Sequence, residues 1–141
     1  MTKKLYLAVL VAFLAALTFG ATAEAARQTF EHFSINVPAG WTVDDDRANS
    51  TVTFLAPDES AALTISAFEH GGTSLGDLAN VLAQQLNGTG LTRADADTYQ
   101  FSFAAEGVDS LAFVSVQEEY CVFITVIGGH ADIPGMLESV Q

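Results

Sequence analysis

The chain has 141 residues, with ten phenylalanines, one tryptophan and a formal net charge of −12. Both lysines lie within the first four residues, so residues 26–141 carry three arginines against 16 carboxylates, a formal charge of −13. Such a surface repels phosphate backbones and anionic lipid head groups, which argues against nucleic acid and against direct membrane binding after processing. Solubility is the simplest explanation of the acidity. Binding of a basic partner or of divalent cations is a more specific explanation of the acidity.

The first 25 residues have the pattern of a secretory signal peptide. Two lysines are followed by an apolar run from Leu5 to Phe19, and two overlapping A-x-A cleavage patterns end at Ala23 and Ala25. The apolar run is shorter than the roughly 20 residues of a spanning helix, so an uncleaved anchor is the weaker alternative. We expect cleavage near Ala23 or Ala25, with Ala25 preferred, and a periplasmic or secreted protein.

Residues 26–141 have the patterning of a single α+β domain. Apolar and polar residues alternate in four segments, which predicts half-buried strands at 33–37, 52–54, 63–67 and 99–103. Residues 110–116 and 120–127 form a predicted hairpin. Its second strand is apolar on both faces, which is typical of a central strand covered from both sides. The polar residues 44–50 are expected to form a loop.

Two helices complete the expected fold. After Gly71-Gly72, Ser74 can cap a helix that ends at Asn87-Gly88. Its predicted apolar stripe consists of Leu75, Leu78, Val81, Leu82 and Leu86. A short last helix begins with a cap at Asp132 and a proline in the first turn, and it is too short to be stable unless docked. Its predicted apolar side consists of Ile133, Met136, Leu137 and Val140. We therefore expect a mostly antiparallel sheet of about six or seven strands flanked by two helices.

The segment Phe33 to Trp41, F-S-I-N-V-P-A-G-W, begins an order of elements that resembles the PsbP and DcrB-like group of small α+β domains. The resemblance continues through the helix at Ser74 to Ala79 and the last helix at Met136 to Val140. It implies an antiparallel sheet between helices and an accessory binding role. The lipid-attachment cysteine of DcrB-like lipoproteins is missing from this sequence.

Three groups of residues are candidates for chemistry. Gly72 to Gly76 matches G-x-S-x-G, which predicts either a hydrolase nucleophile at Ser74, with His70 or His130 as base, or a simple helix cap. Asp44-Asp45-Asp46 suggests a calcium-binding loop or a solvated turn, but the spacing departs from the alternating calcium pattern. His130 near Asp132 is compatible with an acid/base pair or with helix capping.

Two further residues are expected to be structural. Trp41, after Pro38-Ala39-Gly40, is predicted to fill the core, with its ring N–H bonded to a carbonyl. Cys121 lies among apolar residues, which predicts a buried, unreactive thiol. The sequence thus predicts an exported accessory or binding protein, not an enzyme, with an envelope protein as its partner. It predicts no catalytic residues, no metal and no cofactor.

Overall fold

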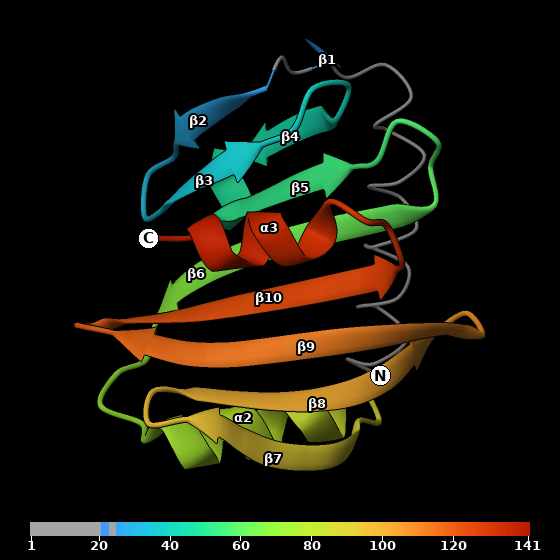
Figure 1. Ribbon diagram of the computed structural model, residues 1–141. Helices are drawn as coiled ribbons and strands as arrows, with labels where there is room; N and C mark the ends of the chain where they lie inside the picture. Colours follow the sequence, from blue (N-terminus) through green and yellow to red (C-terminus); the bar gives the residue numbers. More distant parts are fainter. Residues whose placement is uncertain (1–20, 23–24) are drawn as a thin grey trace.

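The computed structural model describes residues 21–22 and 25–141 (Figure 1). Most of the predicted signal peptide, including Ala23, therefore lies outside the described residues, and its cleavage stays a prediction. None of the helices in the described ranges has the length and apolar character needed to cross a membrane.

An antiparallel sheet in the order β1-β4-β5-β6-β10-β9-β8-β7 extends across the molecule (Figure 1). Every pairing in it is antiparallel, which confirms the predicted α+β class. The strands are β1 (Ala21–Thr22), β4 (Thr42–Asp46), β5 (Thr51–Leu55), β6 (Ala61–Glu69), β7 (Thr89–Asp95), β8 (Thr98–Ala105), β9 (Val108–Gln117) and β10 (Tyr120–Gly128).

Strand β10 lies in the middle of this sheet, between β6 and β9, as its apolar character predicted. Its alternate residues enter two separate cores, because successive side chains of a strand point to opposite faces. Val122, Ile124 and Val126 belong to one core cluster. Cys121, Phe123 and Ile127 belong to the other. The strand must therefore be apolar on both faces.

Each face has its own cover. Helix α2 (Leu75–Gln85) packs on β8 and β9 at one face. The other face carries α3 (Ile133–Ser139) and a separate two-stranded sheet of β2 (Ala26–Thr29) and β3 (Ser34–Val37). Figure 1 shows α3 lying in front of the sheet and α2 behind it. Ile133 and Met136 of α3 are buried, which confirms the predicted docking of the last helix.

The prediction of a loop over residues 44–50 was wrong for residues 44–46. Asp44, Asp45 and Asp46 form the second half of β4, paired with β5, and a short 3₁₀ turn, η2 (Arg47–Asn49), follows. Charged side chains are common on strands near a sheet edge, where they are solvated and discourage pairing with another chain. Two exposed strands, β2 and β7, lack a clear alternating pattern and were not predicted.

The predicted stripe of α2 contained one wrong residue. Val81 is 51% exposed, whereas Ala79 is fully buried and Ala83 is 8% exposed. At 100° per residue, Val81 lies on the side of the helix opposite Ala79, Leu82 and Leu86. Small alanine side chains let the helix approach the sheet closely, so they occupy the contact face in place of the larger valine.

Candidate functional site

The loop between β10 and α3 holds the polar residues that the structure brings together. It follows Gly128, the last residue of β10, whose φ of 78° lies in the left-handed region that favours glycine. A Cβ atom at this position would collide with the backbone carbonyl of Ser60. The chain can therefore turn tightly here and bring His130 and Asp132 over Trp41 at the start of β4.

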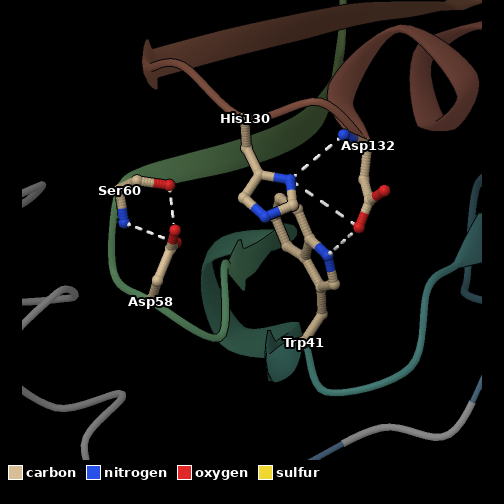
Figure 2. A network of polar contacts seen from close by, with 5 residues as sticks. All are labelled: Trp41, Asp58, Ser60, His130 and Asp132. Atoms are coloured by element: carbon tan, nitrogen blue, oxygen red, sulfur yellow. Dashed lines mark hydrogen bonds and ion pairs between the residues drawn. The ribbon is translucent and has the colours of Figure 1, made fainter.

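Trp41, His130 and Asp132 form a network (Figure 2). Trp41 Nε1 donates to Asp132 Oδ2 at 3.1 Å, and His130 Nδ1 lies 3.6 Å from the same oxygen. The backbone N–H of Asp132 donates to His130 Nδ1 at 3.0 Å. Nδ1 therefore acts as a hydrogen-bond acceptor for the backbone in this arrangement. The indole and imidazole rings meet edge to face at 5.2 Å.

These contacts confirm part of the sequence interpretation and correct another part. Trp41 is fully buried, as predicted, and His130 does pair with Asp132. The partner of the indole N–H is a carboxylate, not the carbonyl that was predicted. Asp132 stands at the N-cap of α3 but makes no side-chain cap hydrogen bond. Its carboxylate points instead to Trp41, because satisfying a buried indole N–H outweighs an exposed cap.

Asp58 lies at the edge of this network (Figure 2). Its Oδ1 accepts hydrogen bonds from the Ser60 hydroxyl at 2.6 Å and from the Ser60 backbone N–H at 3.1 Å. These two bonds lower the pKa of Asp58 below its ordinary value, and the nearby His130 ring makes a smaller contribution in the same direction. The carboxylate therefore stays ionised and holds the turn between β5 and β6 closed.

A cleft of about 620 Å³ lies between the β2–β3 hairpin and the start of α3, and we call it the hairpin–helix cleft. Its accessible apolar surface comes from Ala26, Pro38 and Ala131, whereas Val37 and Met136, which also line it, are almost fully buried. Ala26, Arg27 and Asp132 supply the walls. The cleft thus combines an apolar lining with two charged side chains, which is the usual make-up of a small binding site.

The two charges of the cleft differ in availability. Arg27 donates to four acceptors: Ser34 Oγ at 2.6 Å, Gln141 Oε1 at 3.0 Å, the Ser139 carbonyl at 3.1 Å and Asn36 Oδ1 at 3.2 Å. Asp132 uses one oxygen for Trp41, and its side chain is 42% exposed. Asp132 is therefore the charged group that the cleft can offer to a ligand.

The other candidate residues are separated from this site. Ser74 Oγ accepts the N–H of Asp77 at 3.3 Å and caps α2, which confirms the capping interpretation. His70 is engaged at both nitrogens, because Nδ1 accepts from Gly72 at 3.0 Å and Nε2 bonds the Glu118 carbonyl at 2.8 Å. His130 lies at the opposite end of the β6–β10 pair, so the structure does not bring it to Ser74.

The three aspartates of β4 do not converge. Alternation along the strand sends Asp45 to the face opposite Asp44 and Asp46. Asp45 pairs with Arg47 at 3.4 Å, and Asp46 bonds the side-chain amide of Asn49 at 2.7 Å. Within the described ranges, no cluster of three or more His, Cys, Asp or Glu side chains has the arrangement of a metal site.

Cys121 is fully buried on β10, as predicted. Burial in the core raises the pKa of its thiol to about 11, because the thiolate would lose its hydration. The thiol is in its neutral, unreactive form at physiological pH.

Comparisons with known proteins identify structures with a similar fold. No family model matches the chain, and no curated protein matches it in sequence. The solution structure of cyanobacterial PsbP (CyanoP) from Synechocystis matches with a TM-score of 0.58 at 13% identity, covering 86% of this chain and 95% of CyanoP. A Bacteroides thetaiotaomicron crystal structure matches with a TM-score of 0.57 at 15% identity, covering 84% of this chain. This chain spans about half of that protein, 48% of its length.

The chain therefore has a PsbP-like fold, as the motif order from Phe33 to Val140 predicted. The hairpin–helix cleft was not predicted. Its walls come from residues 25–38 and 131–136, which no sequence pattern connects. Strand β2, which supplies one wall, lacks the alternation by which the other strands were recognised.

Proposed function

We propose that this protein is an exported accessory protein without enzymatic activity, and that it binds an envelope protein through the hairpin–helix cleft. The observation that carries the proposal is the cleft itself, a concave and partly apolar site with one available carboxylate. The PsbP-like fold supports a binding role only as an analogy of fold.

The chemistry of the cleft favours a partner segment that is both basic and apolar. Ala26, Pro38 and Ala131, which line the cleft and are exposed or partly exposed, offer contacts for a hydrophobic side chain. Asp132 offers an acceptor for an ammonium or guanidinium group. The formal charge of −13 on residues 26–141 would speed the approach of a cationic partner. A basic partner is also one of the explanations that the composition left open.

The state of the candidate catalytic groups supports the absence of catalysis. Ser74 Oγ already acts as a helix cap, and both nitrogens of His70 are engaged with backbone groups. A serine nucleophile needs a base within hydrogen-bond reach. Neither histidine proposed from the sequence meets this requirement in the described arrangement.

Capture of partners from an envelope fraction tests the proposal, with variants that alter only the cleft. Gly135 lines the cleft, has open space at its Cβ position and is not in the left-handed region, so Gly135→Phe adds a bulky side chain at the cleft without backbone strain. Gly129 has the same open surroundings but does not line the cleft, which makes Gly129→Phe the matched control.

We expect wild type and Gly129→Phe to retain the same partner and Gly135→Phe to lose it. Thermal unfolding of each variant checks that both remain folded. Equal capture by Gly135→Phe would place the interaction elsewhere on the molecule. Turnover in a screen of ester substrates that disappears in Ser74→Ala would instead support the hydrolase.

A further inference from the structure

Cleavage after Ala25 would leave the protein with a single primary amine. Both lysines of the chain lie in the first four residues, so residues 26–141 contain none. The amine would be the new α-amino group of Ala26. At neutral pH a large share of it is protonated, because an ordinary α-amino group has a pKa near 8. The processed chain would then hold three guanidinium groups and this one ammonium.

The three guanidinium groups already have partners in the structure. Arg27 is bound to four acceptors around the end of the chain. Arg47 pairs with Asp45 at 3.4 Å. Arg93 donates to the carbonyls of Asp95 and Ala96 at 3.2 and 2.7 Å. The α-ammonium would thus be a fourth cation in a strongly acidic protein.

Ala26 and Asp132 line the same cleft. Ala26 is the first residue of β2 and pairs with Val37, the last residue of β3. Asp132 is fixed across the cleft by its bond to Trp41 through Oδ2. Figure 2 shows its second oxygen pointing away from Trp41 and His130. The charged side chains that line the cleft with Ala26 are Arg27 and Asp132, and His130 Nδ1 lies 3.6 Å from Asp132 Oδ2.

We propose that the α-ammonium created at Ala26 pairs with Asp132 across the hairpin–helix cleft, so that the mature amino terminus is an internal ligand of the proposed partner site. This inference rests on the proposed export and on the proposed role of the cleft. The precursor has an uncharged peptide group at Ala26 and lacks this pair. After processing, a basic group of a partner must compete with the amino terminus for the same carboxylate, which makes processing a regulator of binding.

The absence of other amines gives a clean test. The full-length chain is exported and processed in cells, and mass spectrometry identifies the mature amino terminus. The rate of acylation by an amine-specific reagent near neutral pH then reports one site. Pairing with Asp132 holds the proton on the amine and slows the reaction. Asp132→Asn keeps an oxygen for Trp41 but removes the charge, and Asp109→Asn, on the exposed start of β9, is the matched charge control.

We expect acylation of wild type and Asp109→Asn at equal rates, and a reaction roughly threefold faster in Asp132→Asn, which corresponds to about half a pKa unit. Equal rates in all three proteins would overturn the inference. A mature chain that begins at Glu24 would also overturn it. Because this readout needs no partner, its failure is distinguishable from a failure of the capture experiment.

Discussion

Ser34 and Gln141 exchange two backbone hydrogen bonds, each from the N–H of one residue to the carbonyl of the other at 3.0 Å. The last residue of the chain therefore continues the edge of the β2–β3 hairpin. Arg27 on β2 reinforces this closure by donating to the side chain of Gln141 and to the carbonyl of Ser139. The two ends of the domain are thus joined, and α3 is held over the core at its far end.

The last helix is expected to be required for folding. Ending the chain at Ala131 removes Ile133 and Met136, both buried, together with the half-buried Leu137 and Val140. Each such side chain contributes about 1.5–3 kcal/mol when fully buried, so the sum rivals the stability of a typical domain. Size-exclusion chromatography and thermal unfolding should show an aggregated or unfolded product. Glu138→Gln, at an exposed position, should behave as wild type; a monomeric truncated protein with an unchanged midpoint would contradict the prediction.

Arg27→Ala should destabilise the domain, because Arg27 links β2 to β3 and to the end of the chain through four hydrogen bonds, which we call the terminal clasp. Four acceptors lose their donor, all at exposed positions where water replaces it, so we expect a loss of about 1–2 kcal/mol in the free energy of unfolding. Urea denaturation measures this loss. Arg47→Ala removes a single exposed ion pair and should cost less than 1 kcal/mol, roughly. Equal effects of the two substitutions would show that the clasp contributes no special stability.

The Asp58–Ser60 contact should give a pH-dependent contribution to stability. The hydroxyl of Ser60 lowers the pKa of Asp58 from 3.8, so the folded state favours the ionised carboxylate. This stabilisation is present above the unfolded pKa and is lost as the pH falls through the lower folded pKa. Thermal midpoints of wild type and Ser60→Ala should therefore differ at about pH 6 and converge as the pH falls below the lowered pKa of Asp58 in the folded protein. A difference that persists in acid would assign the effect of Ser60 to something other than this carboxylate.

Cys121 should react with thiol reagents only after unfolding. Its pKa of about 11 and its complete burial leave almost no accessible thiolate near pH 8. A disulfide-exchange reagent should label less than one tenth of the thiol, roughly, in the folded protein and all of it in denaturant. Fast labelling of the folded protein would reveal that β10 opens readily.

Ser74 can be tested as a cap and as a nucleophile with two substitutions. Ser74→Ala removes the acceptor for the N–H of Asp77 and should cost about 1 kcal/mol. Ser74→Asp retains a capping oxygen and should preserve stability, although both variants lack the hydroxyl. If the hydroxyl is only a cap, any residual ester hydrolysis should be the same in all three proteins. Loss of hydrolysis in both variants would support the serine hydrolase instead.

The class of fold, the central strand and both main helices could be predicted from the sequence, because burial imposes a period of two on strands and about 3.6 on helices. Residues 120–127 are the clearest case, since only a strand between two cores is apolar on both faces. The signal peptide remains a prediction. The same reasoning led to the error at Val81. It takes large apolar residues to mark the buried face of a helix, and it does not show where close packing requires alanine.

Only the tertiary structure could decide the site. Asp132 looked like a helix cap in the sequence, but its carboxylate bonds the indole of Trp41, 91 positions away in the chain. Ala26 and Asp132 come to one cleft because β2 pairs with β3 and because Gln141 pairs with Ser34. Such contacts depend on where distant backbone segments lie in space. Local periodicity carries information about which face of an element is buried, but not about which distant element covers it.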